Sequence, residues 1–351
     1  MPRQIILQNP PSGAVNLTWG QPDSTFQLAE VEVPEIQPGE LKVRSLYFSN
    51  DPTQRLWIAA NQDPQRQYMA PVFKGEPIRS LGLAEVMESK SDKYVAGDVV
   101  SGFLHWADVL VIPESSVTTK VDKSLPYEWY LSAIGLTGLT AYFGLKKTGL
   151  LQPGQTILVS AASGATGSMV VQLAKHLFKA SKVVGVAGSE EKCRWVESLG
   201  ADLCVNYRDA DYLQQLDNHM AGEYFDVYFD NVGGEMFDYA LRRVKRYGRI
   251  VVCGAIAGYN DTPKMVIESM TEVFSNRLTI QGFLVFDYLS EFDHASKEII
   301  DIIKSGQVSG EDGVHVDDLS QSEGALEKVP EVWHKLFTEE KPRGKLLTKL
   351  V

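Results

Sequence analysis

The sequence predicts an α/β protein that joins a doubly wound parallel sheet to a second, β-rich lobe. Its 351 residues suggest two domains, at about 150 residues each. Up to about residue 124, short apolar runs are broken by proline and glycine, as in an all-β lobe. From about residue 125 to 285, apolar runs of strand length alternate with helical patterns, which is typical of a parallel sheet covered by helices.

The amino-terminal lobe is predicted from short apolar runs that are separated by turn sequences such as Pro38-Gly39. These runs lie at 41–47, 99–103 and 108–112. The last part of the chain is too small for a domain of its own, and it ends in a short strand at 345–349. We expect it to complete the amino-terminal lobe, so that one lobe holds residues 1–125 and 290–351 and the other holds 126–289.

The second lobe contains five nearly continuous apolar runs. They lie at 156–160, 182–187, 225–229, 249–253 and 278–283. Such runs are typical of parallel strands that are covered by helices on both faces. Because crossovers between parallel strands are right-handed, the intervening helical patterns predict a doubly wound sheet.

The composition is that of a folded, acidic protein. Hydrophobic residues make up 44% and charged residues 23%, and 45 acidic against 34 basic residues give a net charge of −11. The acidic balance argues against a nucleic-acid partner, because phosphate-binding surfaces are usually basic. The amino terminus lacks the apolar stretch of a secretory signal, and no apolar run reaches the roughly 18 residues that span a bilayer. We expect a cytoplasmic protein with no membrane partner.

The cysteines predict neither a disulfide framework nor a metal site. Cys193, Cys204 and Cys253 are few and far apart in the sequence. They form no CxxC pair and have no histidine pair nearby, so a structural zinc site is not expected. We expect the three to be small buried hydrophobic residues rather than reactive thiols.

The strongest local motif is a bend of small residues after the run at 156–160. Ala162-x-Gly164-x-x-Gly167 matches the GxGxxG fingerprint with alanine in place of the first glycine, and a helical pattern follows. Gly164 lets the backbone approach a pyrophosphate, and Gly167 lets the helix pack closely on the strand. The amide groups at the helix start, including those of Ala165 and Thr166, then bind the anion. The alternative is a strand-to-helix turn without a ligand.

The next strand predicts a preference for NADPH. Its end, Gly188-Ser189, lacks the acidic residue that usually bonds the ribose 2′-hydroxyl of NAD. Ser189 and Lys192 are suited to cradle a 2′-phosphate, with Tyr207 packed nearby. The alternative for Lys192 is a solvated helix residue. Beyond the next two strands, the polar residues Asn231 and Tyr259 are candidate cofactor and substrate contacts, because ligands bind at the carboxyl ends of such strands. For Tyr259, the alternative is a rim residue without a ligand.

Several ordered motifs together resemble one family. They are 161–168 (AASGATGS), 187–192 (AGSEEK), 228–234 (YFDNVGG), 248–256 (GRIVVCGAI) and 49–52 (SNDP). The chain resembles the medium-chain dehydrogenase/reductase superfamily, in its zinc-independent branch of prostaglandin reductases, leukotriene B4 12-hydroxydehydrogenases and plant alkenal double-bond reductases. The resemblance implies a GroES-like lobe beside a Rossmann domain, and a homodimer.

The resemblance also implies a set of residues that hold NADPH. They are Gly164, Ala165, Thr166, Gly167, Lys192, Tyr207, Asn231, Cys253, Gly254, Ala255, Ile256, Tyr259, Phe283, Leu284 and Val285. Relatives that use zinc carry a catalytic Cys near Asn50-Asp51 and a Gly-His-Glu motif near Gly75-Glu76, and neither the Cys nor the His is present here. We therefore expect hydride chemistry without a metal.

Two departures from the family pattern concern the site. Members commonly read Asp-Pro-Tyr-Met-Arg where this chain has Thr53 and Gln54, so an aromatic residue of many substrate pockets is absent. An Asn that often contacts the cofactor is replaced by Arg343. The expected substrate pocket consists of Asn50, Thr53, His105 and Tyr259.

The resemblance implies reduction of the carbon–carbon double bond of an α,β-unsaturated aldehyde or ketone. A hydride passes from C4 of NADPH to the β-carbon, and Tyr259 donates a hydrogen bond to the carbonyl oxygen, since a phenol is protonated at neutral pH. The alternatives are an NADPH quinone reductase and a cofactor-binding structural or regulatory protein without catalysis.

Overall fold

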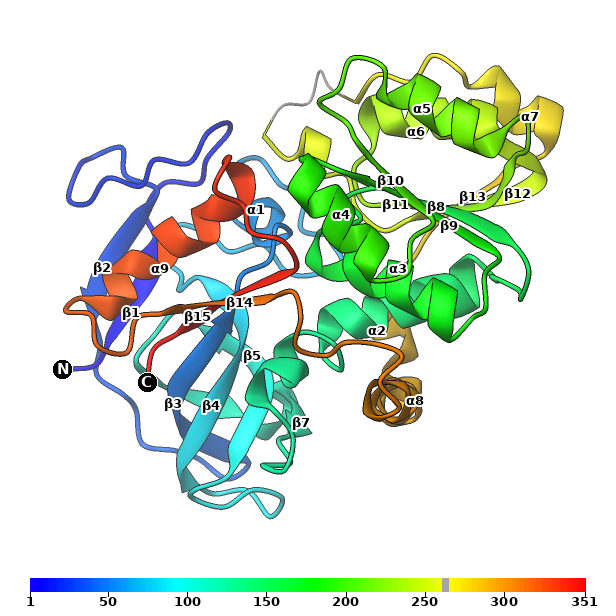
Figure 1. Cartoon of the computed structure of the whole chain (residues 1–351). Helices are drawn as coiled ribbons and strands as arrows, with labels where there is room; N and C mark the ends of the chain where they lie inside the picture. Colours follow the sequence, from blue (N-terminus) through cyan, green and yellow to red (C-terminus); the bar gives the residue numbers. More distant parts are fainter. Residues whose placement is uncertain (261–264) are drawn as a thin grey trace. The chain divides into compact units, whose positions relative to one another are not determined.

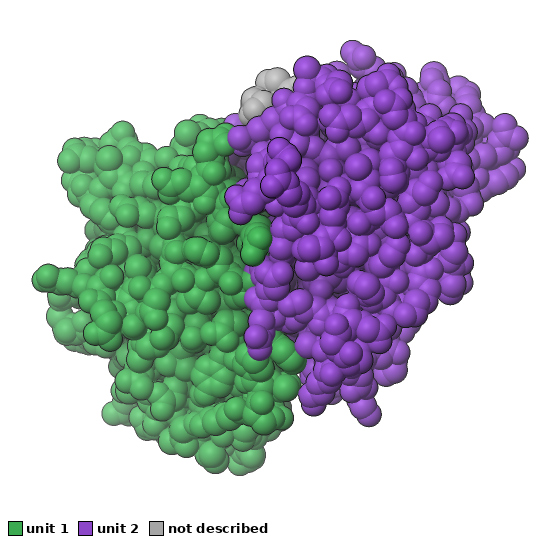
Figure 2. All heavy atoms as spheres, in the orientation of Figure 1, with its two compact units in different colours: residues 1–131, 314–351 green, residues 132–313 purple. Residues whose placement is uncertain are grey.

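The computed structural model describes residues 1–260 and 265–351, which form two compact units. Unit 1 comprises residues 1–131 and 314–351, and unit 2 comprises residues 132–313 (Figure 2). The division therefore falls after residue 131 rather than 125, and residues 290–313 belong to unit 2 rather than to the amino-terminal lobe. The predicted α/β class, a parallel sheet with a separate β-rich lobe, is confirmed.

Unit 1 is built on a seven-stranded sheet of order β14-β15-β3-β4-β5-β7, in which β6 also pairs with β3 (Figure 1). Its strands are β3 (Glu40–Ser49), β4 (Arg79–Ser89), β5 (Val99–His105), β6 (Val109–Pro113), β7 (Val117–Lys120), β14 (Val314–Asp318) and β15 (Lys345–Lys349). A separate hairpin pairs β1 (Arg3–Leu7) with β2 (Phe26–Glu30), and the helices are α1 (Gln54–Trp57) and α9 (Ala325–His334). Because β15 pairs with β3, the end of the chain completes the sheet that the early strands begin.

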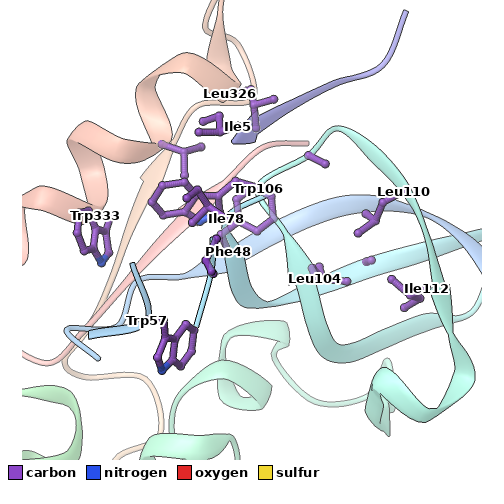
Figure 3. Close-up of a cluster of buried hydrophobic side chains, with 14 of the residues drawn as sticks. Ile5, Phe48, Trp57, Ile78, Leu104, Trp106, Leu110, Ile112, Leu326 and Trp333 are labelled. Atoms are coloured by element: carbon purple, nitrogen blue, oxygen red, sulfur yellow. The ribbon is translucent and has the colours of Figure 1, made fainter. Parts of the chain in front are cut away.

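The core of unit 1 is aromatic and aliphatic. Trp106, Trp333 and Phe26 are buried together, with ring centroids 5.6 to 6.2 Å apart. Aliphatic residues from β1, β5 and α9, among them Ile5 and Leu326, lie around them (Figure 3). Packing of α9 on this core therefore joins the carboxyl-terminal residues to the amino-terminal strands.

Unit 2 contains a parallel sheet of six strands in the order β10-β9-β8-β11-β12-β13. The strands are β8 (Thr156–Val159), β9 (Lys182–Ala187), β10 (Leu203–Asn206), β11 (Phe225–Asp230), β12 (Val244–Val252) and β13 (Thr279–Gly282). All six residues of β11 are buried, as its apolar run predicts. The five predicted strands are present, and the four-residue edge strand β10 is an addition to them.

Helices cover both faces of this sheet (Figure 1). They are α2 (Leu136–Phe143), α3 (Ala165–His176), α4 (Glu190–Ser198), α5 (Tyr212–Met220), α6 (Gly234–Arg243), α7 (Thr271–Asn276) and α8 (Phe292–Lys304). Figure 1 shows α3 and α4 on one face and α5 and α6 on the other, which is the doubly wound arrangement. The order of the strands changes direction between β8 and β11, so the ends of these two strands mark the point where ligands bind in such sheets.

Candidate functional site

The bend between β8 and α3 is held tightly by its own backbone. Ala161 has a positive φ of 46°, and the amide of Gly164 donates to the Ala161 carbonyl over 2.8 Å. A Cβ atom on Gly167 would stand 2.2 Å from the same carbonyl oxygen, so only glycine fits there. This is the close helix–strand packing that the sequence predicts for Gly167. The start of α3, with the half-buried Ala165 and Thr166, carries the partial positive charge of a helix amino terminus.

The ends of β9 and β10 bring together Ser189, Lys192 and Tyr207. The Tyr207 amide donates to the Ala187 carbonyl over 2.9 Å, and its ring lies on Gly188, where a Cβ would stand 2.9 Å from the ring. Ser189 caps α4, because its hydroxyl accepts a hydrogen bond from the Lys192 amide over 3.2 Å. The cap fixes the first turn of α4, in which Lys192 lies.

Arg208 belongs to the same group, and the sequence analysis did not single it out. Its guanidinium lies 6.0 Å from the centroid of the Tyr207 ring, which is itself 53% exposed. The signal that marks it is a basic residue directly after Tyr207. The guanidinium of Arg208 therefore lies beside an exposed aromatic ring, at the edge of the sheet where α4 begins with Lys192 in its first turn.

A buried carboxylate organises the end of β11. Asp230 is 1% exposed. It accepts hydrogen bonds from Tyr228 Oη at 2.6 Å, Ser160 Oγ at 3.1 Å, and the amides of Val232 and Gly233 at 3.0 Å. Burial raises the pKa of Asp230 even though these donors lower it. Burial, followed by the charge of Asp230, raises the pKa of Tyr228 in turn. The sequence analysis did not select Asp230 as a site residue, although an acidic residue at the end of an apolar run is a signal for one.

Asn231 is fixed against the end of β8 through this network. Its backbone amide donates to Ser160 Oγ over 2.9 Å, and its side-chain amide donates to the Ser160 carbonyl over 2.8 Å. Because Ser160 also donates to Asp230, the ends of β8 and β11 form one hydrogen-bonded unit. Asn231 is therefore held in one position before any ligand arrives.

The end of β12 is tied to the same point. The amides of Cys253 and Gly254 donate to the Asp230 carbonyl over 2.8 and 3.1 Å, and the Ile256 amide donates to the Asn231 carbonyl over 3.3 Å. A Cβ on Gly254 would stand 3.4 Å from both the hydroxyl of Tyr259 and the carbonyl oxygen of Asn231. The structure thus brings Asn231, Gly254 and the phenol of Tyr259 together, with Ala255 at the start of the connecting turn.

Two further features complete this loop. Burial, followed by the charge of Asp230, raises the pKa of the Cys253 thiol to about 12, so the thiol is protonated at neutral pH. Met265, which the sequence analysis did not select, packs onto Gly233 and Gly258. A Cβ added to Gly233 would stand 2.6 Å from Met265 Cε, and a Cβ added to Gly258 would stand 2.7 Å from Met265 Cγ. Larger residues at these glycines would displace Met265.

The residues after β13 mainly pack against other side chains of unit 2. The Phe283 ring lies 6.4 Å from that of Phe229 and would contact a Cβ on Gly144 at 2.8 Å. Val285 is buried and Leu284 is half-buried. The cofactor contacts expected of Phe283, Leu284 and Val285 stay predictions.

The other predicted site residues lie in unit 1. Asn50 is 2% exposed, and its side-chain amide donates to Thr348 Oγ1 over 3.0 Å, so it is committed to the pairing of β3 with β15. His105 ends β5, where burial, followed by the charge of Arg79, lowers its pKa. Arg343 is exposed in the segment before β15. The pocket role of Asn50 and His105 and the cofactor role of Arg343 stay predictions.

Thr53 has an aromatic neighbour that the sequence analysis did not identify. The Thr53 hydroxyl lies 2.5 Å from the hydroxyl of Tyr68, and the Trp57 indole donates to the same oxygen over 2.8 Å. Burial raises the pKa of Tyr68. Tyr68 therefore supplies an aromatic ring beside the position where the family commonly has one in the sequence.

Near the place where zinc-using members of the resembled family carry a catalytic Cys, the side chain of Asp51 is engaged by a lysine and a serine. Asp51 is buried and paired with the buried ammonium of Lys345, and it also accepts a hydrogen bond from Ser49. Within residues 1–260 and 265–351, no three His, Cys, Asp or Glu side chains are grouped so that they could hold a metal ion. In the same residues, no helix has the length and apolar character needed to cross a bilayer.

Comparisons with known proteins match both units. The family model described as "Zinc-binding dehydrogenase" matches residues 165–304, and the "N-terminal domain of oxidoreductase" model matches residues 3–121. An NADP(+)-dependent 2-alkenal reductase of Nicotiana tabacum is 34% identical over 96% of this chain and 94% of its own length. Prostaglandin reductase 1 of Bos taurus is 34% identical over 82% of this chain and 84% of its own.

Two other matches cover nearly the whole chain. A Saccharomyces cerevisiae relative that is named an uncharacterized membrane protein is 33% identical over 99% of this chain and 98% of its own length. The crystal structure of CurA in complex with NADPH, from Vibrio vulnificus, is similar with a TM-score of 0.85 and 29% identity, and covers 99% of each chain. The similarity therefore extends over both units.

Proposed function

Because this chain belongs to the medium-chain dehydrogenase/reductase superfamily, in the branch that contains the alkenal and prostaglandin reductases, we propose that it reduces the carbon–carbon double bond of α,β-unsaturated aldehydes or ketones with NADPH. The observation that carries the proposal is the convergence of Asn231, Gly254 and the Tyr259 hydroxyl at the ends of β11 and β12. This group lies where ligands bind in a doubly wound sheet.

The residues of unit 2 fit NADPH along the carboxyl edge of the sheet. The start of α3, with Gly164 and Thr166, suits the pyrophosphate, since helix amino termini bind anions. Arg208, beside Tyr207, and Lys192, in the first turn of α4, supply positive charge for a 2′-phosphate. NADPH, when bound, supplies the hydride.

Tyr259 is the proposed catalytic residue. As the β-carbon of the substrate gains the hydride, negative charge develops on the carbonyl oxygen as an enolate forms. The Tyr259 phenol donates a hydrogen bond to that oxygen and stabilises the charge, and water supplies the proton at the α-carbon. One preorganised donor of this kind is worth roughly 10²–10³ in rate. Asp230 and Ser160 act through Asn231 and the loop after β12, which they hold in place.

A substrate panel tests the reaction class. We expect the purified chain to oxidise NADPH in the presence of short and long 2-alkenals and enones, with lower rates on quinones. Turnover of quinones alone would favour the quinone-reductase alternative. NADPH binding without turnover of any member of the panel would favour a structural or regulatory protein.

A homodimer is also part of the proposal, and the edge of the parallel sheet supports it. β13 is the last strand of the sheet order, with Gln281 and Gly282 exposed. Met270 and Phe274, next to it in the chain, are exposed apolar residues. A strand at the end of a sheet and exposed apolar side chains are both suited to contact with a second copy. Light scattering should give a particle mass of twice that of the chain. For Phe274→Asp, we expect the mass of a single chain. The cytoplasmic location stays a prediction, which cell fractionation would test.

A further inference from the structure

Met265 lies in a notch between two glycines beside the proposed catalytic residue. Gly233 belongs to the turn after β11, and Gly258 directly precedes Tyr259. A Cβ added to Gly233 would stand 3.0 Å from the Met265 sulfur, and a Cβ added to Gly258 would stand 3.1 Å from it. The thioether therefore occupies the space that larger residues would need, and it packs against both bare α-carbons.

The turn that carries Tyr259 has little packing of its own. It is a single 3-10 turn, Ile256–Gly258, and none of its three residues is buried. The backbone joins it to the turn after β11, because the amide of Ala257 donates to the carbonyl of Val232 over 3.1 Å. A segment with few buried contacts is easily displaced. Met265 packs together the same two turns that this backbone bond joins.

The position of this turn determines where the Tyr259 hydroxyl lies. The Tyr259 amide donates to the carbonyl of Ile256 over 3.3 Å, so Tyr259 continues the turn and moves with it. A hydrogen-bond donor stabilises a developing charge only when it is aimed at the oxygen that carries the charge. A misplacement of about 1 Å at a reacting group costs up to roughly 10²-fold in rate. The packing of Met265 is therefore expected to matter for turnover.

We propose that Met265 is a positioning residue for Tyr259. It fills the notch between Gly233 and Gly258 and holds the turn so that the Tyr259 hydroxyl meets the carbonyl oxygen of the substrate. This inference rests on the proposed function. Because Met265 acts through the hydroxyl, its loss lowers turnover much more than it weakens binding of NADPH.

Single substitutions test the packing. Met265→Ala empties the notch, so kcat for a 2-alkenal, counted per bound NADPH to exclude unfolded chains, should fall about tenfold. The dissociation constant for NADPH should change by less than about threefold. Met265→Leu conserves the volume and should keep kcat within about threefold. Met87→Ala, which truncates an exposed methionine of β4, is the control and should match the unsubstituted chain. Unchanged kcat in Met265→Ala, or an equal loss in Met265→Leu, would overturn the proposal.

A double substitution separates the positioning of Tyr259 from a general structural role. Met265→Ala is made in a chain that already carries Tyr259→Phe and so has no hydroxyl to place. In this background we expect the second substitution to lower kcat by less than about twofold, because two residues that act through one group are not additive. A further tenfold loss would show that Met265 acts by another route, and it would overturn the proposal.

The glycine side of the notch provides a reciprocal test. The backbone of Gly258 is not left-handed, so alanine is compatible with it, but the added Cβ meets Met265 Cγ at 2.7 Å. Gly258→Ala should therefore displace the turn and lower kcat about tenfold. Met265→Ala removes that Cγ, so the double variant should keep at least the kcat of the weaker single variant. A loss equal to the product of the two single losses would contradict a shared notch.

The results distinguish this inference from the proposed function. If the unsubstituted chain does not reduce 2-alkenals, or if Tyr259→Phe keeps full turnover, the proposed function or its catalytic residue fails and the role of Met265 falls with it. If Tyr259→Phe lowers turnover and Met265→Ala does not, the proposed function stands and only the positioning role is overturned.

Discussion

Unit 2 presents two kinds of strand end along one edge of its sheet. At the centre, the ends of β8, β11 and β12 are locked by the buried Asp230, which binds donors from Ser160, Tyr228 and the turn that follows. At the margin, the ends of β9 and β10 carry Tyr207, which is half exposed, and the exposed Arg208 beside its ring. The contrast indicates a division of work in which the centre fixes the reacting end of the ligand and the margin selects the cofactor.

The largest expected effect is at the centre. Tyr259→Phe keeps the ring and removes the hydroxyl, so kcat for enone reduction should fall by roughly 10²–10³ because one preorganised donor is lost. The dissociation constant for NADPH should change less than about twofold, because the ring still packs in place. Steady-state kinetics and equilibrium titration measure the two. Unchanged turnover would remove Tyr259 from its catalytic role.

The next effect concerns the hydrogen bonds of Asp230. Asp230→Asn replaces the oxygen that accepts from the Gly233 amide over 3.2 Å by an NH2 group, so two donors face each other in a buried place while the other oxygen still accepts over 3.0 Å. We expect the free energy of unfolding to fall by about 2 kcal/mol. Urea denaturation measures it, with Asp301→Asn on the exposed face of α8 as the matched control. Equal stability of the two variants would show that the centre is not locked by Asp230.

At the margin, Lys192→Ala should change the choice of cofactor and leave the fold unaltered. The dissociation constant for NADPH should rise about tenfold, because a charge-assisted contact with phosphate is lost. The dissociation constant for NADH should change by less than about twofold, since NADH has no 2′-phosphate. Lys304→Ala, an exposed helix lysine on α8, is the control. Equal losses for both cofactors would contradict a role at the 2′-phosphate.

The smallest effect is expected from Gly188→Ala. The added Cβ would stand 2.9 Å from the Tyr207 ring, so the ring must shift at an exposed edge where it has room to do so. We expect the dissociation constant for NADPH to rise about threefold, a fraction of a full contact. Gly13→Ala, with no atom within 4 Å of the added Cβ, serves as the control for stability. A change in kcat at saturating NADPH would mean that the margin also governs the chemistry.

The sequence predicted the parallel sheet and its glycine bend because both depend on local patterns. The five apolar runs are strands, and Gly167 is where only glycine fits. The Asp230 network could not be predicted in this way, because Ser160 and Asp230 are 70 residues apart and meet only when β8 pairs with β11. The same holds for Tyr68 beside Thr53, which lies in a stretch without periodicity.

The division of the chain was predicted with an error that has a physical cause. An amphipathic pattern shows that α8 has an apolar face, but it does not show which unit that face covers. In the structure, Phe292 of α8 stacks on Phe143 of α2 at 5.9 Å, and Glu298 accepts a hydrogen bond from Tyr142. These contacts with α2 hold α8 in unit 2. Likewise, β10 has only four residues and is too short to stand out as a strand in the sequence.

The most direct test of the account follows the hydride. The chain is incubated with NADPH that carries deuterium in the transferred position at C4 and with a 2-alkenal, and the product is examined by nuclear magnetic resonance. The account predicts a saturated aldehyde with one deuterium on the β-carbon. An unsaturated alcohol with deuterium on the former carbonyl carbon, or a substrate recovered without label, would contradict it.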